Sequence, residues 1–121
     1  MTHVFQEPDE IAFNRAGVIG KIFPAEAVTD KADFLLIETD QGHETTIVEQ
    51  ECLFVYYVLN GQGYFEIEDK REDCRAGDLI VIPAGKKFTY KGKLRMLLMN
   101  TPKWSSEQEV VEPAQDKEGL H

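Results

Sequence analysis

Basic residues are scarce in this sequence. Its 121 residues include 13 Lys and Arg against 22 Asp and Glu, which gives a formal net charge of −9. Binding to nucleic acid or to an anionic membrane requires a positively charged surface, so neither kind of partner is expected. Part of the charge is local, because residues 107–121 contain five acidic side chains and one lysine. We interpret that segment as a solvated stretch that serves solubility.

Cysteine and long apolar runs are scarce as well. Cys52 and Cys74 do not form a C-x-x-C metal motif, and two cysteines without a secretion signal are typical of free thiols in a reducing compartment. No segment approaches the roughly 20 apolar residues of a membrane span. Residues 1–10 have neither the basic nor the apolar region of a secretion signal. We therefore expect a cytoplasmic protein, and its length is that of one domain.

Short runs rich in β-branched and aromatic residues dominate the sequence after residue 17. Gly, Asp, Asn and Pro separate these runs, a pattern typical of a β-sandwich or β-barrel. The predicted strands are Val18–Phe23, Asp33–Thr39, Thr45–Glu49, Leu53–Leu59, Tyr64–Glu68, Asp78–Ile82, Lys87–Tyr90 and Leu94–Met99.

Two motifs predict tight turns. Asn60-Gly61-Gln62-Gly63 has the residues that a hairpin turn with positive φ requires. Pro83-Ala84-Gly85 follows an apolar strand and predicts a second turn. We expect an N-terminal arm (1–17), a β-barrel (18–104) and an acidic, flexible tail (105–121).

Two motifs together resemble the paired motifs of the cupin family. They are Glu51–Gly63 (ECLFVYYVLNGQG) and Gly77–Phe88 (GDLIVIPAGKKF). The second motif of that family reads Gly, five residues, Pro-x-Gly, two residues and a metal-binding His, and Phe88 stands at the His position. The resemblance implies an all-β fold, namely an antiparallel double-stranded β-helix or jelly-roll barrel. It also implies frequent pairing of two barrels through a sheet face or an exchanged edge strand.

The four metal-ligand positions of the family fall on Ile47, Glu49, Phe54 and Phe88 in this sequence. A transition metal needs three or four imidazole, carboxylate or thiolate donors, and one carboxylate cannot replace them. The histidines are His3, His43 and His121, of which only His43 is near these positions. We therefore expect neither a metal nor another cofactor.

Strand alternation predicts which side chains point into the barrel. On this basis the interior contains Thr45, Ile47, Glu49, Phe54, Tyr56, Phe88 and Tyr90. Two interpretations remain open. The rings fill the interior as a packed core, or they line a pocket for a carbohydrate-like ligand with a few polar groups. Glu49 is the only candidate general acid or base.

Three functions follow. The leading hypothesis is a metal-free barrel that binds a small, carbohydrate-like molecule without turnover. A second is a metal-independent isomerase, epimerase or lyase that uses Glu49 with Tyr56 or Tyr90. A third is a degenerate barrel that serves as a protein-interaction or sensor module. Leu53–Leu59 is apolar on both faces, which requires a second layer, and we expect a homodimer.

Overall fold

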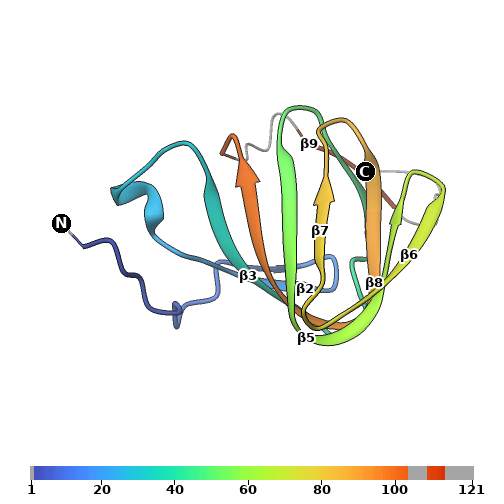
Figure 1. Ribbon diagram of the computed structural model, residues 1–121, viewed down its shortest axis with the longest axis horizontal. Helices are drawn as coiled ribbons and strands as arrows, with labels where there is room; N and C mark the ends of the chain where they lie inside the picture. Colours follow the sequence, from blue (N-terminus) through green and yellow to red (C-terminus); the bar gives the residue numbers. More distant parts are fainter. Residues whose placement is uncertain (1, 104–108, 114–121) are drawn as a thin grey trace.

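In the part of the chain that the structure describes, nine antiparallel strands form one sheet that bends back on itself (Figure 1). The computed structural model describes residues 2–103 and 109–113. In chain order the elements are β1 (Phe13–Arg15), β2 (Val18–Ile22), a 3-10 turn (Ala25–Ala27), β3 (Asp33–Thr39), β4 (Thr45–Glu49), β5 (Leu53–Ile67), β6 (Lys70–Arg75), β7 (Leu79–Ile82), β8 (Lys87–Thr101) and β9 (Glu109–Pro113).

β5 and β8 hold the two halves of the sheet together. Each has 15 residues, and the two strands pair from Leu53↔Thr101 to Ile67↔Phe88. One half has the order β1-β2-β3-β8-β5-β7, and the other has the order β9-β4-β8-β5-β6. Figure 1 shows both long strands bending at the lower edge of the view, so that the halves face each other. The predicted all-β jelly-roll barrel is confirmed.

One apolar cluster fills the space between the two halves. Its buried members are Val18, Leu35, Ile37, Ile47, Cys52, Phe54, Tyr56, Val58, Phe65, Cys74, Ile82, Phe88, Tyr90, Leu94, Met96 and Leu98. These side chains come from seven of the nine strands and from the turn before β5. The free energy of their burial is the main term that holds the fold together.

The predicted strands Asp33–Thr39 and Thr45–Glu49 are confirmed with their bounds. The predicted strands Leu53–Leu59 and Tyr64–Glu68 fall in β5, which ends at Ile67, and Lys87–Tyr90 and Leu94–Met99 are parts of β8. β6 was not predicted, because its sequence (KREDCR) is charged and buries only Cys74.

The predicted hairpin turn at Asn60–Gly63 is wrong, because these residues continue β5 through the bend of the sheet. A Cβ atom on Gly61 would lie 2.0 Å from the carbonyl oxygen of Lys93, and one on Gly63 would lie 2.0 Å from that of Lys91. The glycines therefore permit β5 and β8 to cross at close range. The hairpin turn lies instead at Glu68 and Asp69, between β5 and β6.

Segments assigned to the arm and the tail add strands to the barrel. β1 belongs to the expected arm and pairs with β2. β9 belongs to the expected tail and pairs with β4 along its whole length. The rest of the expected tail lies outside the described residues. The predicted turn at Pro83–Gly85 is confirmed between β7 and β8. In the described chain the helical structure is a single 3-10 turn, and no helix there has the length and apolarity that a membrane crossing requires.

Candidate functional site

Five aromatic rings meet inside the barrel. The ring centroids of Tyr56 lie 5.1 Å from Phe65, 5.5 Å from Tyr90 and 6.0 Å from Phe88, and Phe54 lies 5.2 Å from Phe88. All five side chains are buried. The structure thus places the predicted residues Phe54, Tyr56, Phe88 and Tyr90 inside and brings them together. Edge and tilted contacts of this kind are favourable, so the middle of the interior is packed.

The residues at the four ligand positions of the cupin motifs do not fit a metal ion. Ile47, Phe54 and Phe88 have no donor atom in their side chains, which leaves Glu49 alone. Among residues 2–103 and 109–113, no three His, Cys, Asp or Glu side chains lie close enough together to hold a metal.

Glu49 is buried and anchors the loop between β4 and β5. Its Oε1 accepts hydrogen bonds from the backbone N–H of Glu51, at 2.6 Å, and of Cys52. Its Oε2 is buried and has no hydrogen-bond partner. These contacts give the carboxylate a structural use, while its predicted catalytic use stays a prediction.

The inward-facing side chains of β4 continue through Thr45 to His43, which lies just before the strand, at the end of the barrel opposite Glu49. The carbonyl oxygen of Thr45 lies 2.9 Å from Nδ1 of His43, nearer than Thr45 Oγ1 at 3.1 Å or Thr45 N at 3.3 Å. A carbonyl oxygen only accepts, so we assign the proton to Nδ1. Nε2 then bears the lone pair, which is the form a proton acceptor needs.

His43 is held on its backbone side as well. Its carbonyl oxygen accepts hydrogen bonds from Lys91 Nζ, at 2.7 Å, and from Thr89 Oγ1, at 3.1 Å. Its N–H donates to the carbonyl oxygen of Tyr90 at 2.9 Å. Burial lowers the pKa of His43 from 6.5 to about 4, with Lys91 and Arg15 contributing in the same direction. The imidazole is therefore neutral at neutral pH.

His43, Tyr56 and Tyr90 form one polar-tipped cluster at the edge of the ring packing. The centroid of Tyr90 lies 5.5 Å from that of His43 and 5.5 Å from that of Tyr56. His43 itself is only partly buried. The cluster thus combines one imidazole and two phenols, which are able to accept and donate protons. We refer to these three residues as the His–Tyr cluster.

Sequence reasoning missed two members of this region. Alternation along the strand gives His43 the same facing as Ile47, but the prediction did not include His43 among the site residues. Phe65 was not predictable in this way. The pairing of β5 with β8 shifts by one residue between Val58 and Asn60, so inward positions change from even to odd numbers along β5.

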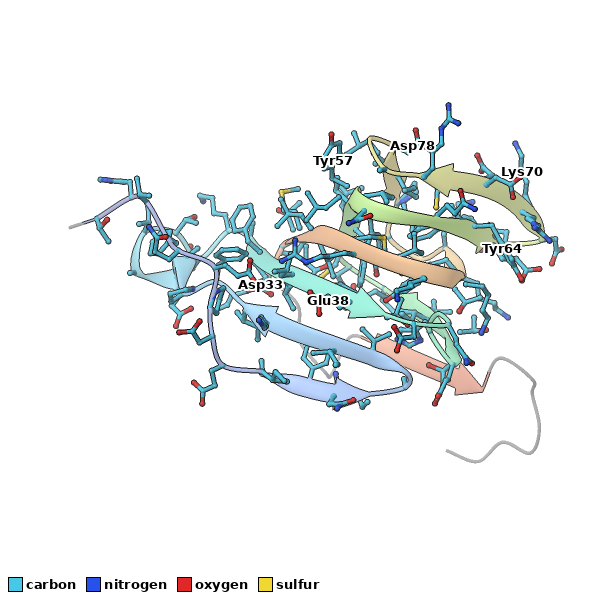
Figure 2. All side chains as sticks on the ribbon, turned by 90° about the horizontal axis from the view of Figure 1, so that it is seen from below. Asp33, Glu38, Tyr57, Tyr64, Lys70 and Asp78 are labelled. Atoms are coloured by element: carbon cyan, nitrogen blue, oxygen red, sulfur yellow. The ribbon has the colours of Figure 1, made fainter. Side chains whose placement is uncertain are left out.

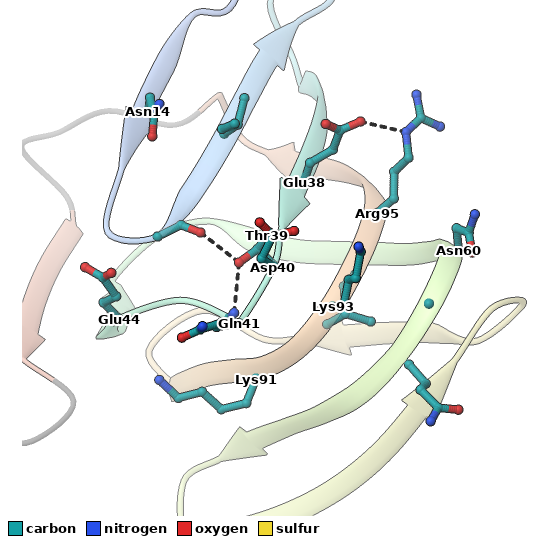
Figure 3. A pocket seen from close by; sticks show the side chains of 16 residues that line it. Asn14, Glu38, Thr39, Asp40, Gln41, Glu44, Asn60, Lys91, Lys93 and Arg95 are labelled. Carbon is teal, nitrogen blue, oxygen red and sulfur yellow. Dashed lines mark hydrogen bonds and ion pairs between the residues drawn. The ribbon is translucent and has the colours of Figure 1, made fainter.

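A separate cleft lies on the outer side of β8 (Figure 3). Its volume is about 980 Å³, and Lys91, Lys93 and Arg95 line one wall. Glu38, the partner of Arg95 on β3, accepts a 2.8 Å hydrogen bond from Arg95 Nε. The lining mixes cations and anions and contains neither an aromatic ring nor an imidazole. We place the candidate site at the His–Tyr cluster instead.

Comparison with known proteins gives both a family and a fold. Residues 34–92 match the family described as an AraC-like ligand binding domain. An acireductone dioxygenase of Yarrowia lipolytica is 36% identical over 115 residues, which cover 83% of this chain and 66% of that protein. The chain thus spans about two thirds of the length of that relative.

Two solved structures show the same fold. Pac13 of Streptomyces, described as a nucleoside dehydratase, has a TM-score of 0.85 at 22% identity, over 94% of this chain and 93% of that one. A cupin described as RmlC-like, from Shewanella frigidimarina, has a TM-score of 0.65 at 16% identity, over 81% and 86%. The Pac13 structures with uridine include variants in which a histidine is replaced by glutamine, or one of two tyrosines by phenylalanine.

Proposed function

Because this chain belongs to the cupin superfamily, we propose that its barrel is a metal-independent binding site for a small hydroxyl-bearing ring compound of the nucleoside class. The His–Tyr cluster supplies the polar groups at the edge of the packed rings, where His43 is only partly buried. The observation that carries this proposal is the convergence of one imidazole and two phenols on the inner wall of the barrel.

The substitutions reported for Pac13 support the choice of ligand class. The substituted histidine and the two substituted tyrosines have the same separations along the Pac13 chain as His43, Tyr56 and Tyr90 have here. Those proteins hold uridine. Uridine combines a flat base, which stacks on aromatic rings, with ribose hydroxyls, which bind phenol and imidazole groups.

Titration calorimetry with uridine as the probe tests this proposal. We expect wild-type protein to bind uridine, and Tyr56→Phe and Tyr90→Phe each to weaken binding about fivefold, because each removes one hydrogen bond of about 1 kcal/mol. Tyr64→Phe is the matched control, since Tyr64 lies on the outer side of β5 under the guanidinium of Arg71, 3.8 Å from its ring centre. Absence of uridine binding, or equal losses in all three variants, contradicts the proposal.

A second candidate is a lyase that removes water from such a ligand. The neutral His43 would take a proton from a carbon next to a carbonyl group, a double bond would form, and the hydroxyl on the next carbon would leave with a proton from Tyr56 or Tyr90 as water. A pKa near 4 makes His43 a weak base, so the carbonyl group is needed to acidify that carbon. His43 takes the role that the sequence hypothesis gave to Glu49.

Proton NMR of 2-deoxyribose incubated with the protein separates binding from turnover, since its open form has a hydroxyl on the carbon β to an aldehyde. Alkene signals that grow with wild-type protein and with Glu49→Gln, but not with His43→Gln, support a lyase that uses His43 as its base. If the alkene signals disappear only in Glu49→Gln, Glu49 is the catalytic residue, as the sequence hypothesis proposed. Without alkene signals the barrel is a binding protein.

A cytoplasmic location and a homodimer stay predictions.

A further inference from the structure

Arg15 lies at the last position of β1, on the inner side of the sheet. It pairs with Val18 across the β1–β2 ladder, and residues paired in this way have their side chains on the same face. Val18 is a buried member of the apolar cluster that fills the barrel. The exposed side chain of Arg15 therefore starts from the face of β1 that turns toward the interior.

The ring of Phe13 holds the guanidinium group of Arg15 in place. The guanidinium carbon lies 4.8 Å from the centre of that ring. Phe13 in turn packs against the apolar cluster and lies across Gly20, where a Cβ atom would be 2.1 Å from the ring. A guanidinium over an aromatic face is attracted to it, and the N–H groups at its edge stay available for hydrogen bonds. Arg15 is thus positioned before a ligand arrives, which lowers the entropic cost of binding.

The turn that follows Arg15 is bonded to the loop that carries His43. The N–H of Glu44 donates to the carbonyl oxygen of Ala16 at 2.8 Å. Ala16 follows Arg15 and Glu44 follows His43, so this hydrogen bond brings the two neighbouring side chains to the same end of the barrel. Both start from inward-facing positions, and the His–Tyr cluster lies at this end.

The charge of Arg15 acts on His43. Burial is the main cause of the low pKa of His43, and the charges of Lys91 and Arg15 lower this pKa further. A cation has such an effect only from nearby. Lys91 lines the outer cleft and donates to the His43 carbonyl oxygen, so its ammonium group lies outside the barrel wall, whereas Arg15 belongs to the inner side. Among the described residues, no carboxylate forms an ion pair with Arg15.

From this arrangement we infer that the ligand of the His–Tyr cluster carries an anionic group, a phosphate or a carboxylate, and that Arg15 binds this group. The inference rests on the proposed function, and it makes the ligand an anionic derivative of a nucleoside. A guanidinium binds either kind of group through two parallel hydrogen bonds. The chain has a net charge of −9 and repels anions in general, so a cation beside the site is needed to hold such a ligand.

The outer cleft is less suited to the same anion. Its arginine, Arg95, is already paired with Glu38 at 2.8 Å and with Glu7 at 2.9 Å. The carboxylates of Asp40 and Glu44 line the cleft as well and would repel an anion. Arg15 therefore provides the better anion site of the two.

Titration calorimetry with uridine, uridine 5′-monophosphate and uridine 5′-carboxylate tests this inference. We expect one or both anions to bind the wild-type protein at least about tenfold more tightly than uridine, because hydrogen bonds between charged groups are stronger than neutral ones. The tighter of the two anions identifies the group as phosphate or carboxylate. Arg15→Gln should remove the gain and leave the affinity for uridine unchanged, which also shows that this variant is folded.

Arg75→Gln is the matched control, because it removes the same charge from another exposed arginine. Arg75 lies on β6, and Figure 2 shows β6, which begins at the labelled Lys70, at the opposite edge of the molecule from β1. This variant should bind all three compounds as the wild type does. Arg15→Lys should recover only part of the gain, since an ammonium group has the charge but not the planar pair of donors.

The results separate this inference from the proposed function on which it rests. If uridine binds as tightly as both anions, the inference is overturned and the proposed function stands. The same holds if Arg15→Gln weakens uridine and the anions equally, or if Arg75→Gln loses as much anion affinity as Arg15→Gln. If none of the three compounds binds, both the inference and the proposed function are wrong.

Discussion

The rings of His43 and Tyr90 make a T-shaped contact, with centroids 5.5 Å apart and an angle of 70° between the planes. The same two residues are linked through the backbone, where His43 N–H donates to the carbonyl oxygen of Tyr90. The position of the imidazole is therefore fixed by both main chain and side chain. This rigidity is what a preorganised site requires.

The pKa of His43 predicts how stability depends on pH. The folded chain holds this pKa at about 4, whereas the ordinary value is 6.5. Between these values the unfolded chain binds a proton that the folded chain does not, so the free energy of unfolding falls as pH decreases from 6.5 to 4. The loss attributable to His43 approaches about 3 kcal/mol at pH 4 and does not grow below it.

Urea unfolding of wild type and His43→Gln across this pH range measures the effect. The carboxylates titrate in both proteins, so the difference between the two profiles isolates His43. We expect the difference between the free energies of unfolding of the two proteins to change steadily between pH 6.5 and 4 and to be constant above pH 7.5. Parallel profiles would show that the imidazole is not held in a desolvated environment.

The crossing of β5 and β8 predicts different costs for two glycine substitutions. Gly63→Ala would place a Cβ atom 2.0 Å from the Lys91 carbonyl oxygen, and the backbone would have to move. Gly77 has φ +96 but nothing within 4 Å of the added atom, so Gly77→Ala bears only the conformational cost of about 1–2 kcal/mol. Thermal unfolding should show a far lower Tm, or no folded protein, for Gly63→Ala. Equal Tm values would contradict the close crossing.

The buried thiols should be unreactive in the native protein. Burial, with the Glu49 carboxylate as the next cause, raises the pKa of Cys52 to about 12, and burial also raises the pKa of Cys74. The thiolate is the reactive form, so Ellman's reagent at pH 8 should detect almost no thiol before unfolding and two per chain in guanidinium chloride. Rapid reaction of one thiol in the native state would place Cys52 or Cys74 at the surface.

Alternation made most of the barrel predictable. β4 has the predicted bounds because it alternates between buried and partly exposed positions, and β3 has them because its apolar run from Phe34 to Ile37 is flanked by polar residues. Alternation also placed Ile47, Phe54, Tyr56, Phe88 and Tyr90 inside. The Gly-x-Gly motif at 61–63 led to the wrong prediction of a hairpin turn, because glycine occurs both in tight turns and where strands cross closely. Only the partner strand distinguishes these two uses.

The limits of the site prediction have a physical cause too. A bulge of one residue reverses the facing of the second half of β5, which concealed Phe65. Glu49 looked like the reactive group because it is the sole carboxylate at the ligand positions. Its bonds to the N–H groups of Glu51 and Cys52 depend on the shape of a loop, and alternation does not describe loops.

Two aromatic rings, an isoleucine and one loop-anchoring carboxylate occupy the positions where a metal-binding cupin has its ligands. Elemental analysis by inductively coupled plasma mass spectrometry tests it most directly, on untagged protein supplied with zinc, iron, nickel and manganese and then desalted. We predict far less than one ion of any of these metals per chain, with Phe88→Ala giving the same result. One tightly bound ion per chain would contradict the account.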